Sequence, residues 1–283
     1  MTKSILGMGL LLLTAVLIGS PSASAMTPIC GRTYGIVEYL ELIFDKPCNQ
    51  ITDAEIGGVQ YLSLSKLNGL KPGDFDGFTS VSNMTLSGSN LTDVPASAFS
   101  GLVSLRKMYF SSITFNKIPD APFAELPLLN EMIIYDLEVP DLPDNFFQGT
   151  DLRVLIFDSD QGVPRLPADL FQHSPRLRRV DLGNSGYKTL PAGLFRNLIY
   201  LQRLALTNIE MDEESARAIF EPLVGLSKVW LNYGGTWHIP DGIFNQHPQL
   251  SHIYYDGTIP QLAALEKSYQ GKIAFIQGDP PQW

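Results

Sequence analysis

Residues 177–206 read LRRVDLGNSGYKTLPAGLFRNLIYLQRLAL and contain a six-residue word, L-x-x-L-x-L with one Val variant, twice at a distance of 24 residues. The word recurs nine times along the chain, always with an apolar residue at its fourth position. These residues are Leu62, Met84, Met108, Met132, Leu155, Val180, Leu204, Val229 and Ile253, and the steps between them are 22, 24, 24, 23, 25, 24, 25 and 24 residues. A period of this length predicts a solenoid, in which each unit buries its apolar face against its neighbours.

A second word follows each strand word. It reads LPADLF at 166–171, LPAGLF at 190–195 and IPDGIF at 239–244, and looser copies lie at 94–99 and 142–147. Because side chains alternate between the two faces of a strand, the fourth and sixth letters of the strand word point into the core. The third and fifth letters, and the residue after the word, point outward. The pattern therefore predicts a parallel sheet with an outward face that can be assigned repeat by repeat.

The two words together resemble the leucine-rich repeat family, in its subtype with an L-P-x-x-L-F segment, over residues 59–255. The resemblance implies an α/β fold, a curved horseshoe-shaped solenoid with a parallel concave sheet of about nine to ten strands. It also implies protein recognition, without enzymatic activity, as the usual function. One departure concerns the Asn that the family carries at its ninth repeat position, since here only Asn68 and Asn90 fit it.

The ends of a solenoid must be covered. Residues 36–44 place apolar side chains at helical spacing, and Thr52 with Glu55 forms a capping-box pattern at the start of a second short helix. The stretch from Cys30 to residue 54 resembles the helical N-terminal cap of exported bacterial leucine-rich repeat proteins, which implies a Cys30–Cys48 bridge that ties the cap down. Asp212 is expected to cap a short helix over residues 213–223. A helix over 261–269 and a strand over 272–277 are expected at the other end.

The first 25 residues have the features of a secretory signal peptide. Lys3 supplies the positive segment, residues 5–18 are apolar, and Ala23-Ser24-Ala25 is a small-x-small cleavage site. An uncleaved membrane anchor is the alternative, and Gly19-Ser20-Pro21 disfavours it. The expected organisation is a signal peptide at 1–25, a helical cap at 26–58, repeats at 59–258, and a C-terminal helix, strand and tail at 259–283.

Export and charge restrict the possible partners. Removal of Lys3 changes the formal net charge from −9 to −10, which argues against nucleic acid as a partner. The only two cysteines, Cys30 and Cys48, most simply form one disulfide in an oxidising compartment. No second apolar stretch is long enough to span a membrane. We therefore expect a secreted or periplasmic protein without a cofactor.

Catalytic and metal-binding patterns are weak. His173 and His247 follow the Phe of the turn word, which favours ordinary turn residues, and His238 lies in a loop. His252 is the only histidine in a strand word, and alternation predicts that the adjacent Ser251 points to the opposite side. Residues 158–162 begin like a calcium loop but lack the later Gly that this loop requires. The sequence thus predicts no catalytic residue and no metal site.

The outward letters of repeats three to five are largely apolar or aromatic. We name the group formed by Tyr109, Ile133, Tyr135, Val154 and Ile156 the apolar patch. Patches of this kind on a solvent-facing sheet are typical of interaction sites, and aromatic residues are typical anchors. Cover by neighbouring loops is the alternative.

A row of basic residues follows in the later repeats. Arg179, Arg203, Lys228 and His252 occupy the same outward position, and we name them the basic column. Like charges about 5 Å apart repel each other, so either nearby Asp residues pair with them or an anionic partner does. Trp230 and Tyr254 are expected to line this column.

The hypothesis from the sequence is an exported protein that binds another protein through its concave face. A structural or self-associating protein, with the apolar patch buried in a homodimer, is the alternative. Glycan binding through Tyr109, Tyr135 and Trp230 stays open.

Overall fold

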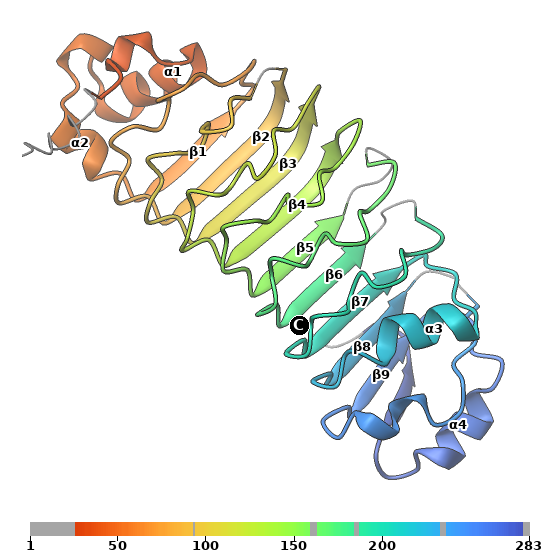
Figure 1. Cartoon of the computed structure of the whole chain (residues 1–283). Coiled ribbons are helices and arrows are strands. Elements are labelled where there is room, and N and C mark those ends of the chain that lie inside the picture. Colours follow the sequence, from red (N-terminus) through yellow and green to blue (C-terminus); the bar gives the residue numbers. More distant parts are fainter. Residues whose placement is uncertain (1–25, 93, 159–162, 184–186, 233–235, 280–283) are drawn as a thin grey trace, which may run out of the picture.

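The computed structural model describes residues 26–92, 94–158, 163–183, 187–232 and 236–279. In this part of the chain ten strands pair in parallel and in sequence order to form one sheet. Figure 1 shows these strands side by side in one elongated sheet, with helices at its two ends. The predicted signal peptide at residues 1–25 lies outside the described residues. The predicted leucine-rich repeat solenoid, with a parallel sheet of about nine to ten strands, is confirmed.

The elements follow the repeat closely. The strands are β1 Tyr61–Ser65, β2 Asn83–Leu91, β3 Lys107–Phe115, β4 Glu131–Glu138, β5 Val154–Asp158, β6 Arg179–Gly183, β7 Arg203–Thr207, β8 Lys228–Asn232, β9 His252–Tyr255 and β10 Ala274–Gln277. The helices are α1 Tyr34–Phe44, α2 Asp53–Gly57, α3 Glu213–Phe220 and α4 Leu262–Ser268, with short 3-10 turns η1 Ile29–Gly31, η2 Cys48–Gln50 and η3 Ile243–Gln246.

The core lies beneath the sheet. The fourth and sixth letters of the strand word are buried in every repeat, as Leu204 and Leu206 illustrate, and neighbouring strands pair these letters in register. Burial of each such side chain contributes roughly 1.5–3 kcal/mol, so nine repeats of this pattern hold the strands in one register. A shift by one residue would turn every buried side chain toward solvent.

The turn word forms the opposite wall of the core. Its Pro carbonyl accepts the N–H of the residue three positions later, as between Pro167 and Leu170 and between Pro191 and Leu194, both at 3.2 Å. This turn directs the Phe of the word inward. The Phe rings form a buried column along the solenoid, with centroids 4.9–6.3 Å apart between successive members; these members are Phe75, Phe99, Phe123, Phe146, Phe147, Phe171 and Phe195.

A left-handed residue follows most strand words. Lys66, Gly88, Ser112, Asp136 and Asn208 have φ of 51–59° and lie four residues after the middle apolar position. In β2, β3 and β4 the strand continues beyond this residue, and the buried side chains change phase there, from even to odd sequence numbers. The left-handed residue therefore turns the chain so that apolar side chains on both sides of it face the core.

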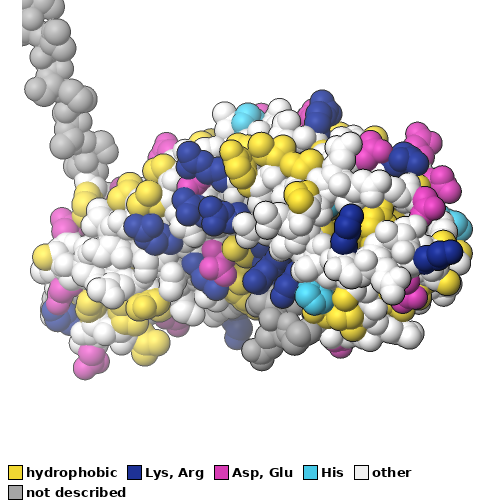
Figure 2. Space-filling model, turned by 90° about the horizontal axis from the view of Figure 1, so that it is seen from below, with side chains coloured by type: hydrophobic (Ala, Val, Ile, Leu, Met, Phe, Trp, Pro, Cys, Tyr) yellow, Lys and Arg dark blue, Asp and Glu magenta, His cyan; other side chains and the backbone are white. Residues whose placement is uncertain are grey.

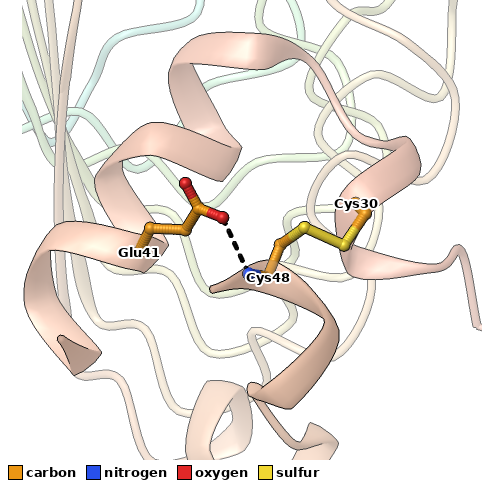
Figure 3. The surroundings of a disulfide bond; sticks show 3 residues. All are labelled: Cys30, Glu41 and Cys48. Atoms are coloured by element: carbon orange, nitrogen blue, oxygen red, sulfur yellow. Dashed lines mark hydrogen bonds between the residues drawn. A yellow bond between two sulfur atoms is a disulfide. The ribbon is translucent and has the colours of Figure 1, made fainter. Parts of the chain in front are cut away.

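The N-terminal end is closed by α1, which contacts β1 and buries Ile36 and Leu40. The predicted bond between Cys30 and Cys48 is present, and Figure 3 shows it beside α1. The carboxylate of Glu41 in α1 accepts the backbone N–H of Cys48 at 2.7 Å, so helix and disulfide share one anchor. The predicted capping box of α2 is formed by Thr52 and Glu55, and Asp212 caps α3 as expected. A hydrogen bond from Lys46, and then bonds from Thr52, lower the pKa of Glu55 to about 2.

The C-terminal end is formed by α4 and β10, near the positions that the sequence predicts. Tyr269, just after α4, is buried and its hydroxyl accepts the backbone N–H of Phe244 at 3.0 Å. Within the described ranges, no helix has both the length and the apolar character needed to cross a membrane.

Candidate functional site

The outward residues of the strands form three columns across the sheet, because neighbouring strands pair residue by residue. The first column runs through Lys107, Glu131, Val154, Arg179, Arg203, Lys228 and His252. The second runs through Tyr109, Ile133, Ile156, Asp181, Ala205, Trp230 and Tyr254. Ser111, Tyr135 and Asp158 belong to the third.

The structure brings the five residues of the apolar patch together. Tyr109, Ile133 and Ile156 are consecutive members of the second column, with Val154 and Tyr135 on either side. All five side chains are half-buried. The rings of Tyr109 and Tyr135 lie 5.7 Å apart at 53°, a tilted arrangement that fixes both of them. The patch is therefore an ordered apolar surface that is open to solvent in part.

The basic column is also formed. Arg179, Arg203 and Lys228 pair in register on β6, β7 and β8, and all three are half-buried. Asp181 lies 3.8 Å from Arg179 and offsets part of its charge. One row earlier, Asp151 accepts from both Arg153 and Arg176 at 3.1 Å. Asp181 therefore pairs with one member of the basic column as expected, whereas Asp151 pairs with arginines outside the column.

Figure 2 views the molecule from the side at which the strands begin. Lys and Arg side chains are gathered across the middle of this face, and most of the Asp and Glu side chains in view lie toward its two ends. A chain with a net charge of −9 thus concentrates cations in one area. Such a concentration attracts anionic partners even when the whole molecule is acidic.

The prediction for Tyr254 is wrong in one respect. Its side chain is only 5% exposed, so it does not line an open surface. Its ring stacks on that of His252, with centroids 5.8 Å apart at 10°. Trp230, its partner in the sheet register, is half-buried and stays among the accessible residues. The C-terminal part of the concave face is therefore more closed than the alternation of the strand predicts.

The prediction for Ser251 is also wrong. Its hydroxyl lies 2.8 Å from Nδ1 of His252, instead of on the opposite side of the strand. Ser251 precedes β9, so strand alternation does not apply to it. The same hydroxyl bonds to the Ser227 carbonyl at 3.2 Å, and the Ser227 hydroxyl donates to the Gln202 carbonyl at 2.9 Å. These serines therefore form a ladder that joins successive repeats.

His247 has a structural role. His247 is buried, its Nε2 lies 2.8 Å from the Phe220 carbonyl, and burial lowers its pKa. It joins η3 to the end of α3. Among the residues that the structure describes, no group of three His, Cys, Asp or Glu side chains is placed to hold a metal ion. The calcium-like loop is mostly outside the described residues.

An open groove of about 610 Å³ lies away from the concave face. It runs along the ends of the first repeats and is lined by loop residues such as Pro72, Val94, Pro95 and Pro119. The sequence does not predict this groove, because the groove is lined by turn-word residues that the repeat itself explains.

Asp181 is the most perturbed group of the concave face. Burial raises its pKa to about 6, against the attraction of Arg179 and with a smaller contribution from Asp158. Burial also raises the pKa of Tyr135, with smaller contributions from the charges of Tyr109, Asp158 and Asp181. The junction between the apolar patch and the basic column therefore holds a carboxylate that titrates near neutral pH.

The Asp181→Asn variant should be about 3 kcal/mol more stable than the parent protein at pH 7.5, and the difference should shrink to about 1 kcal/mol at pH 4.5. The folded-state pKa of about 6 lies above the ordinary 3.8, so the folded state binds the proton first and gains stability as pH falls through this window. Urea unfolding of both proteins across this range measures the difference. Because burial lowers the pKa of His247, this residue makes the folded state less stable as pH falls, but its contribution is the same in both proteins and cancels. A difference in stability that does not depend on pH would contradict the prediction.

Residues 59–178 match a family model described as BspA type leucine rich repeat region, in six copies. No curated protein matches the chain in sequence. Among solved structures, an internalin from Listeria monocytogenes is similar with a TM-score of 0.64 and 16% identity, over 92% of this chain and 75% of that one.

Two structures of complexes are also similar. A Toll–Spatzle complex from Drosophila matches with a TM-score of 0.55 and 21% identity, over 76% of this chain and 34% of the other. A TLR13–ssRNA13 complex matches with a TM-score of 0.57 and 21% identity, over 75% of this chain and 32% of the other. The chain thus spans about a third of the length of each of these two matched chains, and at these identities the likeness shows the fold alone.

Proposed function

We propose that this chain, which is a leucine-rich repeat protein, binds another protein through the concave face of its sheet. The fold is one that is generally used for protein–protein recognition. The observation that carries the proposal is the apolar patch, five half-buried apolar or aromatic side chains side by side on the solvent face of β3, β4 and β5.

The composition of this face favours a protein partner. Interfaces combine an apolar and aromatic centre with charged groups around it, and Tyr, Trp and Arg are the residues most often responsible for affinity. Here the patch supplies the centre, and Arg179, Arg203 and Lys228 supply charge that would steer an acidic partner. Nucleic acid fits less well, because the chain carries a net charge of −9 and the apolar patch offers nothing to a phosphate backbone.

Export is part of the proposal. Residues 1–25 would direct secretion and be removed, residues 26–58 and 259–283 would close the two ends, and residues 59–258 would present the binding face. The disulfide between Cys30 and Cys48 supports an oxidising location, since such bonds persist mainly outside the cytosol. We assign no catalytic role to any residue.

The variant Ile133→Glu/Ile156→Glu tests the proposal. Charges placed at the centre of an interface are desolvated without partners, so we expect at least about a 100-fold loss of affinity for any protein that the wild type retains. Val103→Glu/Ile199→Glu is the matched control, because both side chains are 49% exposed and lie in loops before β3 and β7. Equal retention of the partner by the patch variant and the wild type would overturn the proposal.

Two further measurements distinguish the other two functions. If light scattering shows a dimer for the wild type and a monomer for the patch variant, the patch serves self-association. If the wild type binds oligosaccharides and loses them on Tyr109→Ala or Trp230→Ala, the face is a glycan site. Circular dichroism of each variant establishes that the solenoid is intact before binding is compared.

A further inference from the structure

The apolar patch and the basic column are parts of one continuous strip. Val154 belongs to the patch and pairs directly with Arg179, the first residue of the column. The strip therefore runs across the strands, from β3 to β9, with its apolar part first and its basic part second. A partner element that fills it must lie across the strands and change from apolar to acidic along its length.

The spacing of the column favours one kind of secondary structure. Neighbouring strands lie about 4.8 Å apart, so the three steps from Arg179 to His252 span about 14 Å. An α-helix presents one residue per turn, every 5.4 Å or so, and covers about 16 Å in three turns. An extended strand presents same-side residues about 6.7 Å apart and covers about 20 Å in three steps. The helix differs from the column by about 2 Å over this length and the strand by about 6 Å, so the helix needs the smaller adjustment of the Arg and Lys side chains.

The chemistry of the column favours carboxylates. Two of its four members are Arg, whose planar guanidinium pairs with a carboxylate through two parallel hydrogen bonds. Arg179, Arg203 and Lys228 are all half-buried, so part of each cationic side chain is accessible to a partner on this face. A uniformly anionic polymer would leave the apolar patch without a matching surface, whereas an amphipathic helix covers both parts.

We infer that the element recognised by the concave face is an amphipathic α-helix that lies across the strands, apolar over β3–β5 and acidic over β6–β8. The five steps from β3 to β8 span about 24 Å, which corresponds to a helix of about 16 residues. The assignment of a helix rests on the proposed function, because it presumes that the concave face binds a protein.

Three synthetic 20-residue peptides of identical length test the inference by fluorescence anisotropy. The matched peptide carries Leu at one position per turn in one half and Glu at the continuing positions in the other half, on an Ala background. The scrambled peptide has the same composition with these residues distributed around the helix. The broken peptide is the matched peptide with two central Ala residues replaced by Pro, which prevents a continuous helix.

The matched peptide is expected to bind the mature chain at least about tenfold more tightly than either other peptide, and to become helical on binding. Arg203→Glu/Lys228→Glu should weaken it by about tenfold or more, and added salt should weaken it as well. The control Arg165→Glu/Lys188→Glu makes the same change in net charge at loop positions that are 71% and 76% exposed, and should leave binding unchanged.

Two outcomes would overturn the inference. One is equal binding of the broken peptide, which would show that helical spacing is not recognised. The other is no binding of the matched peptide to the wild type. The proposed function is judged separately, by the effect of Ile133→Glu/Ile156→Glu on the natural partner. If a natural partner depends on the patch but the matched peptide does not bind, the inference of a helix is wrong and the proposed function is kept.

Discussion

Replacement of Gly101 by Ala is expected to lower the free energy of unfolding by about 4 kcal/mol or more. Gly101 has φ of +92°, where an L side chain is strained by about 1–2 kcal/mol. An added Cβ would also lie 2.3 Å from the Phe75 carbonyl oxygen and 2.8 Å from its carbon, both backbone atoms of the preceding repeat. The two repeats would have to separate, which disturbs the packing of Phe75 on Phe99.

Gly271→Ala is the matched control. Its φ of +78° imposes a similar backbone strain, but nothing lies within 4 Å of the added Cβ. We expect a loss of only about 1 kcal/mol there, from the left-handed conformation alone. Urea denaturation of both variants, followed by circular dichroism, measures the difference. Equal losses of unfolding free energy in the two variants would contradict the prediction, because they would show that the contact with Phe75 adds nothing to the backbone strain.

The sequence predicts the repeat-level features well, because they depend on local periodicity. The alternation of apolar letters gives the strands, and the constant period puts Arg179, Arg203 and Lys228 in one column without any knowledge of the structure. Capping residues are equally local, since Thr52 with Glu55 and Asp212 with Ser215 need only a three-residue spacing. The apolar patch was predictable for the same reason.

Features that depend on contacts between repeats could not be predicted. The left-handed position after the strand word is occupied by Lys66, Ser112 and Asp136 as well as by Gly88, so no residue type marks it. Ser251 turns toward His252 because it lies before the regular strand begins and finds a carbonyl of the preceding repeat. Tyr254 has the right position for exposure and is nevertheless buried.

The attachment of the N-terminal cap is a further feature of this kind. The sequence predicts the disulfide of the cap but carries no signal for Asp74, which lies in the first turn region and is completely buried. Its carboxylate accepts from the backbone N–H and the hydroxyl of Thr33, both at 2.7 Å, and from the backbone N–H of Lys71 at 2.6 Å. Thr33 is the residue that precedes α1, so Asp74 fixes the start of the cap helix to the first repeat.

Asp74→Ala is therefore expected to destabilise the protein by about 4 kcal/mol, because three donors lose a buried charged acceptor at once. Arg32 adds to the effect. It is 2% exposed, donates to the carbonyls of Asp74 and Asp76 at 3.1 and 2.8 Å, and stands over the ring of Phe78. Burial lowers its pKa while the carboxylates of Asp76 and Asp74 raise it, so loss of Asp74 leaves this cation with less compensation.

Asp76→Ala provides the comparison within the same turn. Asp76 accepts from the backbone and the hydroxyl of Thr27 at 3.0 and 2.9 Å, but these bonds are only partly buried and hold the chain ahead of the cap. We expect about 1–2 kcal/mol for this variant. Hydrogen exchange should show faster opening of α1 in Asp74→Ala than in Asp76→Ala, with β5–β9 protected in both, because each repeat contacts mainly its neighbours. Uniform loss of protection along the solenoid would show instead that the cap and the repeats unfold as one unit.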